Sequence, residues 1–296
     1  MNWKKEISEI EKRAAMSESM GGAEKVKLQH KHGKLTVRER IELLTDKGSF
    51  HEIGKLAGQS EYDEKGELVS LKPSNFVMGG ATIDGLQIIV SGDDFTVRGG
   101  SADASIGEKR IHAEGIASEL GLPHIRLVDG MGGGGSVKTI ETSGRTCIPR
   151  VAGWEMVVAQ LAKSPSISLA LGSVAGIGAA RVTSSHYSVI VKSSAQMMIA
   201  GPALVEWANL GEVNKEELGS SKIHTRNGSV DDEANSEKAS FEMARTFLSF
   251  LPDSVDHIPS RIPCSDPTNR REETFCLLYT SPSPRDVEDS RMPSSA

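Results

Sequence analysis

The chain has 296 residues and a formal net charge of −6, so it is long enough for one large domain or two small ones and is poorly suited to binding nucleic acid. No apolar run approaches the roughly 20 residues of a membrane span, and the charged start does not resemble a signal peptide, so we expect a cytoplasmic protein without membrane contact. The three cysteines, Cys147, Cys264 and Cys276, have neither metal-ligand nor disulfide-framework spacing, which fits a reducing compartment.

Residues 2–20 form the first predicted element, a charged amphipathic helix. Ile7, Ile10 and Ala14 lie on one stripe of this helix. We expect the stripe to serve packing or contact between the subunits of an oligomer.

A second, shorter helix is predicted to begin after Thr36. Thr36 and Glu39 have the spacing of a capping box, in which each side chain binds the backbone amide of the other residue. Gly48 offers a stop. The apolar face is expected to consist of Ile41, Leu43 and Leu44.

Residues 76–90 contain two extended runs on either side of Asp84-Gly85. This dipeptide between apolar runs is the strongest hairpin signal in the chain. The following stretch, 93–100, is expected to lead into a helix near residues 105–120.

From residue 124 onward a unit of apolar strand, glycine-rich turn and helix is repeated. Strands are predicted at 124–129 and 167–171, a loop at 130–135, and helices at 150–162 and after Gly176. This alternation predicts an α/β layer fold with functional sites at the carboxyl ends of the strands.

The most informative stretch is 171–180, Leu-Gly-Ser-Val-Ala-Gly-Ile-Gly-Ala-Ala, where an apolar run leads directly into small residues that open a helix. Such a turn aims backbone N–H groups at a ligand oxygen, helped by the helix dipole. Because side chains are nearly absent, chemistry there must depend on main-chain donation to an oxyanion such as a thioester enolate. The alternative is a tight packing turn between strand and helix.

Further strands are predicted at 187–191 and 196–200, and a helix at 235–251 that Pro252 ends. Its inward-facing side chains are expected to be Ala239, Met243, Phe247 and Phe250.

The composition changes near Phe275. Residues 276–296 have no periodicity and are rich in serine and proline, which predicts disorder. Two pieces of this tail also resemble translated sequencing-library adaptors, so we interpret 276–296 as non-native and residues 1–275 as the domain. A natural disordered C-terminus is the alternative.

Several short motifs together resemble the carboxyltransferase (beta) subunits of biotin-dependent acyl-CoA carboxylases, above all propionyl-CoA carboxylase. Their order and spacing make the match specific, and it spans nearly all of residues 4–275. The motifs are Gly33-Lys34-Leu35-Thr36, Arg38-Glu39-Arg40-Ile41, Asp94-Phe95-Thr96-Val97, Gly99-Gly100-Ser101, Gly107-Glu108-Lys109, Gln196-Met197, Gly201-Pro202, Glu217-Leu218-Gly219 and Asp266-Pro267.

This resemblance implies a crotonase-like fold, of which the chain covers the N-terminal half. It implies transfer of a carboxyl group from carboxybiotin, on a separate carrier protein, to the carbon alpha to an acyl-CoA thioester. No metal is expected, because hydrogen bonds from backbone amides suffice to stabilise the enolates. The implied partners are a biotin carboxylase and a biotin carboxyl carrier subunit, and the implied full-length state is a homo-oligomer.

The resemblance places the family's adjacent oxyanion amides on Gly176 and Ile177. The family commonly has a second glycine where Ile177 stands, but a backbone donor survives that change. Gly178, one residue later, is assigned to substrate binding together with the loop glycines Gly132, Gly133 and Gly134. A flexible surface loop is the alternative at 132–134.

Basic residues within the matched motifs are candidates for binding the phosphates of CoA. They are Lys34 and Arg38 above all, and also Arg98 and Lys109. The alternative for each is a structural ion pair. His30 and His32 are expected to be solvated.

Two functions from different classes therefore compete. The chain is either part of an acyl-CoA carboxyltransferase, inactive as this fragment until it is completed, or a module that binds acyl-CoA without transferring anything. A biotin-dependent decarboxylase subunit that uses the same chemistry in reverse is a further alternative among enzymes.

Overall fold

The computed structural model describes residues 3–101, 107–130, 153–252, 256–258, 263–265, 267 and 269. The chain divides into two compact units, Met1–Pro259 and Ser260–Ala296, and every element given below belongs to the first. Residues 131–135 of the predicted loop and the tail 276–296 lie outside the described residues.

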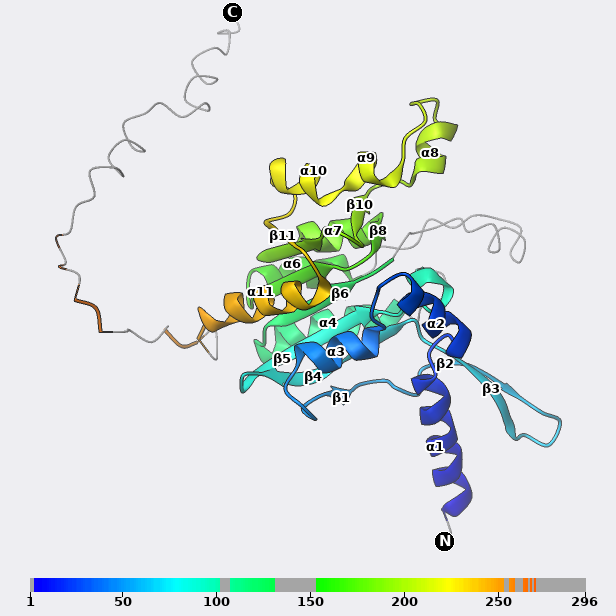
Figure 1. Cartoon of the computed structure of the whole chain (residues 1–296). Coiled ribbons are helices and arrows are strands. Elements are labelled where there is room, and N and C mark those ends of the chain that lie inside the picture. The colour runs from blue at the N-terminus through cyan, green and yellow to red at the C-terminus, as the bar shows by residue number, and fades with distance from the viewer. Residues whose placement is uncertain are drawn as a thin grey trace, which may run out of the picture. The chain divides into compact units, whose positions relative to one another are not determined.

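A seven-stranded sheet forms the centre of this unit (Figure 1). In spatial order its strands are β1 (His51–Glu52), β4 (Phe76–Ile83), β5 (Leu86–Asp93), β6 (His124–Val128), β7 (Ser166–Ala170), β9 (Tyr187–Val191) and β11 (Asp232–Ala234). The first three are antiparallel, and the pairing is parallel from β5 to β11. Every residue of β6 and β7 is buried, as expected for parallel strands covered on both faces.

Helices cover both faces of the sheet. On one face α3 (Val37–Leu44) and α11 (Glu237–Ser249) lie side by side, in front of the sheet in Figure 1. The other face carries α4 (Gly107–Leu120), α6 (Trp154–Leu161) and α7 (Ile177–Thr183). The α/β layer arrangement predicted from the sequence is therefore present.

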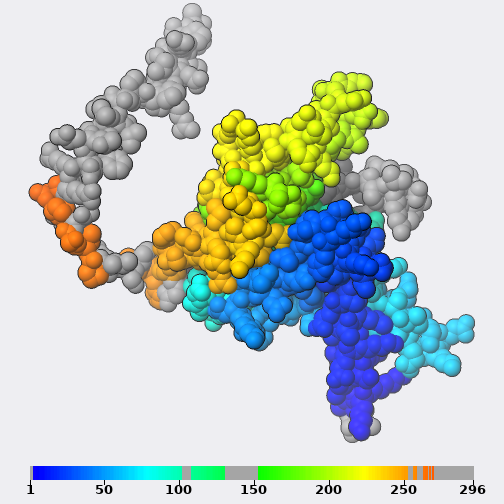
Figure 2. Space-filling view, in the orientation of Figure 1, coloured from blue at the N-terminus to red at the C-terminus, as the bar shows by residue number. Residues whose placement is uncertain are grey.

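The remaining elements surround this core. They are α1 (Lys4–Glu18), α2 (Ala23–Lys31), the hairpin strands β2 (Gly58–Tyr62) and β3 (Leu68–Pro73), the short η1 turn (Arg98–Gly100), the paired strands β8 (Ser173–Ala175) and β10 (Gln196–Met198), and α8 (Pro202–Trp207), α9 (Lys215–Gly219) and α10 (Ser221–Arg226). Figure 2 shows α1 and the segment around α8 standing out from the sheet-forming part. Among the described helices, none is long and apolar enough to cross a membrane.

Two local sequence signals are confirmed in detail. The Thr36 hydroxyl accepts a hydrogen bond from the Glu39 N–H (3.3 Å), and the Glu39 carboxylate accepts one from the Thr36 N–H (2.8 Å). Asp84 and Gly85 join β4 to β5 with positive φ values of 50° and 83°, the backbone conformation that favours this dipeptide in hairpins.

Two packing predictions are wrong because they fall near helix ends or off the buried face. Leu43 is 51% exposed, since Ile41 and Leu44 define the buried face of α3. Phe250 is 71% exposed because it is the C-cap of α11, whose buried face runs through Leu248 instead. The predicted stop at Gly48 also lies beyond the actual end of α3.

The stripe predicted on the first helix is not buried against the rest of the described chain. Ile7 is 53% and Ile10 52% exposed on α1. Its predicted role in oligomer contact stays a prediction.

Candidate functional site

The sequence suggests that the glycine-rich turn at 176 follows a strand of the main sheet directly. In the structure it does not. After β7 the chain first forms β8, which pairs in parallel with β10, and α7 begins only at Ile177. β8 has only three residues, which is too short for a pattern of polar and apolar side chains to predict it. Gly176 lies between the two elements with φ 59° and ψ −120°, a conformation that favours glycine.

The backbone amides of this turn have different partners. The Gly176 N–H donates to the carbonyl oxygen of Met198 at 3.0 Å, so this predicted oxyanion donor is already engaged. Among the described residues, the N–H groups of Ile177 and Gly178 have no acceptor, as is usual in the first turn of a helix. The first bond of the helix is donated by Ala180, so the Ala179 amide likewise has no acceptor among the described residues, and Ile177 and Gly178 are the two free donors nearest the predicted turn.

Two other backbone segments meet beside this turn. The Ala175 N–H donates to the Gly130 carbonyl at 3.2 Å, which ties β8 to the end of β6. Gly130 in turn lies against the η1 turn so closely that a Cβ on Gly100 would collide with the Asp129 carbonyl oxygen. The carboxyl end of β6 therefore brings the motif at 99–100 and the turn at 176 together. The predicted loop glycines Gly132, Gly133 and Gly134 lie outside the described residues.

Lys34 is turned into the protein at this end of the sheet. Its Nζ donates to Asp129 Oδ1 at 2.7 Å and lies 4.2 Å from the centre of the Phe95 ring. Burial lowers the pKa of Lys34, and the attraction of the Asp129 carboxylate opposes that shift. Gly172 packs so closely on this pair that any Cβ there would collide with the carboxylate. The arrangement favours the structural ion pair over a contact with phosphate.

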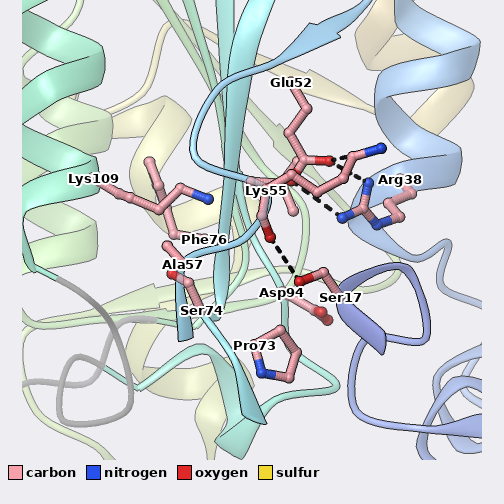
Figure 3. Close-up of a pocket in the computed structure, with 11 residues that line it drawn as sticks. Ser17, Arg38, Glu52, Lys55, Ala57, Pro73, Ser74, Phe76, Asp94 and Lys109 are labelled. Carbon is pink, nitrogen blue, oxygen red and sulfur yellow. Dashed lines mark hydrogen bonds and ion pairs between the residues drawn. The ribbon is translucent and has the colours of Figure 1, made fainter. Parts of the chain in front are cut away.

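Arg38 also forms an ion pair. Its guanidinium donates two hydrogen bonds to the Glu52 carboxylate, at 2.8 and 3.2 Å. Figure 3 shows both side chains at a small internal pocket, with Lys109 and Asp94 among its other lining residues. A structural role is therefore favoured for Arg38 as well.

Lys109 in this pocket provides a pH test of the structure. Burial, with Arg38 and Arg110 nearby, lowers the pKa of Lys109 to about 8 from 10.5, although Glu52 opposes the shift. Between these values the unfolded chain binds more protons at this position than the folded chain, so stability rises with pH in that window. We expect the free energy of unfolding, measured with urea, to rise from pH 8 to 10.5 for the unmodified chain relative to Lys109→Met. A constant difference between the two would contradict the lowered pKa.

A surface groove between α2 and the η1 turn is lined by several basic side chains. The groove has a volume of about 310 Å³. It is lined by Lys25, Leu28, Gln29, His32, Phe95, Thr96, Arg98 and Gly99. Three of these residues are basic and none is acidic, so the groove suits an anionic ligand with an apolar part.

Of the basic residues in this groove, Arg98 was a candidate from the sequence and Lys25 was not, whereas His32 is exposed, as predicted. The available signal was the run of basic residues between positions 25 and 34. α2, which carries Lys25 on the groove side, is not among the helices predicted from the sequence.

Other residues that could suggest side-chain catalysis are engaged elsewhere. His186 Nδ1 accepts a hydrogen bond from the Ser166 N–H at 3.1 Å. Asp93 pairs with Arg110 at 2.9 Å, whereas Asp94 accepts hydrogen bonds from Thr96. Within the described part of the chain, no group of three or more His, Cys, Asp or Glu side chains could hold a metal ion.

Comparison with known proteins gives consistent matches. The sequence model of one protein family, the carboxyl transferase domain, matches residues 28–290. The propionyl-CoA carboxylase beta chain of Cereibacter sphaeroides is 32% identical over 279 residues, which make up 92% of this chain and 52% of that protein. The methylmalonyl-CoA decarboxylase subunit alpha of Veillonella parvula is 28% identical over 290 residues, 96% of this chain and 55% of that protein.

The fold is also found among solved structures. A transcarboxylase 12S structure, from a hexamer with hydrolysed methylmalonyl-coenzyme A bound, matches with a TM-score of 0.72 and 26% identity, covering 90% of this chain and 52% of that chain. The present chain thus spans about half the length of these relatives. The family match extends to residue 290, into the segment 276–296, whose interpretation as non-native stays a prediction.

Proposed function

This chain belongs to the carboxyl transferase domain family and has its crotonase-like α/β fold, and we propose that it is the N-terminal portion of an acyl-CoA carboxyltransferase subunit. The proposed reaction moves a carboxyl group from carboxybiotin to the alpha carbon of an acyl-CoA such as propionyl-CoA. The observation that carries the proposal is that the Ile177 and Gly178 amides have no acceptor among the described residues, one position on from the pair Gly176 and Ile177 expected from the sequence.

These amides suit the step that makes the alpha carbon nucleophilic. Loss of the alpha proton places negative charge on the thioester oxygen, and preorganised N–H donors stabilise that charge as it develops. The positive end of the α7 dipole adds to their effect. The isoleucine side chain at 177 does not alter its amide, so the departure from the family's glycine leaves the donor in place.

Two adjacent amides can serve the oxygen of one enolate, not of two at once. We therefore assign Ile177 and Gly178 to the thioester and expect the biotin site in the half of the relatives' length that this chain does not span. Carboxybiotin would supply the carboxyl group and then a basic ureido nitrogen for the alpha proton. The proposed partners are accordingly a biotin carboxylase and a biotin carboxyl carrier, in a cytoplasmic homo-oligomer.

The groove between α2 and η1 is our proposed place for the phosphates and adenine of CoA. Lys25, His32 and Arg98 supply basic side chains there, and Phe95 supplies an apolar ring. This assignment replaces Lys34 and Arg38, whose charges are matched by Asp129 and Glu52. The η1 turn then connects the CoA groove with the oxyanion turn.

A charge reversal in the groove tests this placement. We expect Lys25→Glu to weaken binding of CoA about tenfold at low salt, because the new carboxylate repels the phosphates, and less at high salt. Isothermal titration calorimetry measures the affinity. Lys47→Glu, an exposed lysine outside the groove, makes the same change of net charge and serves as the control. Equal losses in both variants would place CoA elsewhere.

One experiment separates the competing functions. Propionyl-CoA binding is measured with the chain alone, and carboxyl transfer with the chain joined to the C-terminal half of a relative. Binding followed by transfer supports the carboxyltransferase, and binding without transfer supports the acyl-CoA-binding module. Loss of CO2 from methylmalonyl-CoA as the favoured direction would support a decarboxylase subunit, as in the Veillonella relative.

A further inference from the structure

A single buried carboxylate joins three elements on the α4 side of the sheet. Glu114 of α4 is completely buried. It accepts two hydrogen bonds from Arg126 of β6, at 3.0 and 2.8 Å, and one from Arg181 of α7, at 2.6 Å. His124 Nδ1 lies 3.1 Å from Oε2 of the same carboxylate.

The same cluster also holds the far end of α7. Arg126 Nη1 donates to the Ser184 carbonyl at 2.8 Å and to the Arg181 carbonyl at 3.4 Å. These carbonyls belong to the last turn of the helix, which has no partners of its own within the helix. α7 is therefore held by its Arg181 side chain and by its C-terminal carbonyls, and Glu114 binds both arginines that make these attachments. The Ser168 hydroxyl also donates to the Arg181 carbonyl, at 3.3 Å.

The charges make this dependence strong. Burial alone would raise the pKa of Glu114, but His124, Arg126 and Arg181 outweigh it and hold the pKa well below its usual value. Among the described residues, Glu114 is the only hydrogen-bond partner of the Arg181 guanidinium. Without the carboxylate, the Arg126 and Arg181 guanidinium groups would lose the counter-charge that they share.

We propose that Glu114 is a positioning residue, which through Arg181 and Arg126 fixes α7 and thereby the turn at Gly176 and Ile177 with which that helix begins. The role of the turn in holding a thioester rests on the proposed function. α7 has only seven residues, roughly 10 Å at 1.5 Å per residue, so a tilt at its C-terminus moves its first amides. Small displacements of a donor from a reacting oxygen are costly.

Hydrogen exchange of the whole chain tests the positioning directly. In Glu114→Gln, one carboxylate oxygen becomes an NH2 donor that faces a guanidinium, and in Arg181→Met only the direct side-chain link between Glu114 and α7 is removed. We expect the amides of residues 173–184 to exchange about tenfold faster in both variants, beyond any change in the β4–β5 hairpin. Glu52→Gln is the matched control, because the Glu52 side chain is also buried and bound by an arginine, Arg38, but makes no hydrogen bond to α7 among the described residues. If Glu114→Gln does not fold, Arg181→Met decides the question.

Ligand binding adds a readout that general loosening would not give. We expect Glu114→Gln and Arg181→Met to bind propionyl-CoA about tenfold more weakly. CoA, which lacks the thioester oxygen, should bind both variants with unchanged affinity. Equal losses for the two ligands, or unchanged exchange at 173–184, would overturn the proposal. If the unmodified chain binds neither ligand, the proposed function fails, and the exchange experiment alone decides whether Glu114 positions α7.

Discussion

Ile177→Pro is expected to lower carboxyl transfer about 100-fold to 1000-fold, the usual cost of losing one oxyanion donor. The measurement uses the chain joined to the C-terminal half of a relative, so that turnover can be followed. Proline has no amide hydrogen, and Ile177 is the first residue of α7, the helical position that best accepts proline. The substitution therefore removes a donor while leaving the helix able to form.

Ile177→Val is the control for this prediction, because it keeps the amide and changes only the size of the side chain. We expect nearly normal turnover in this variant. Circular dichroism establishes that the proline variant is folded. Near-normal turnover of the folded proline variant would remove Ile177 from the oxyanion site and leave the Gly178 amide, or the loop at 132–134, as the better candidate.

Features of the fold that depend on neighbouring residues were predictable from the sequence. The capping box at Thr36 and the hairpin at Asp84 each need only a few adjacent residues, and both form as predicted. The repeated strand and helix pattern gave the α/β class for the same reason. The ends of elements were less accurate, as Phe250 illustrates, because the end of a helix depends on what packs against it.

The partners of charged side chains were not predictable, because they come from distant parts of the chain. Lys34 lies near Arg38 in sequence, yet its partner is Asp129, 95 residues away. The matched motifs contain both basic residues but could not distinguish an ion pair from a phosphate contact. The engagement of the Gly176 amide by Met198 was hidden for the same reason, since it requires the unpredicted pairing of β8 with β10.

Arg40 is the strongest case of such a distant partnership. Its guanidinium is fully buried and binds Asp129 through Nη1 at 2.8 Å, and Glu237 through Nε and Nη2 at 2.9 and 2.7 Å. It thereby links α3 on one side to the end of β6 and on the other to the start of α11. The position of Asp129, beside Gly100 and Gly172 of the candidate site, depends on this link.

We therefore expect Arg40→Met to lower the free energy of unfolding by about 3–5 kcal/mol, because the Glu237 carboxylate would remain buried without its counter-charge and Asp129 would keep only that of Lys34. Methionine fills much of the space of the arginine stem, so the loss measures charge more than volume. The control is Lys72→Met, which breaks the exposed pair with Glu61 and should cost less than about 1 kcal/mol. Urea unfolding followed by circular dichroism measures both variants. Similar, small losses in the two would mean that Asp129 and Glu237 find other partners or water, and that the Arg40 network does not hold this end of the sheet together.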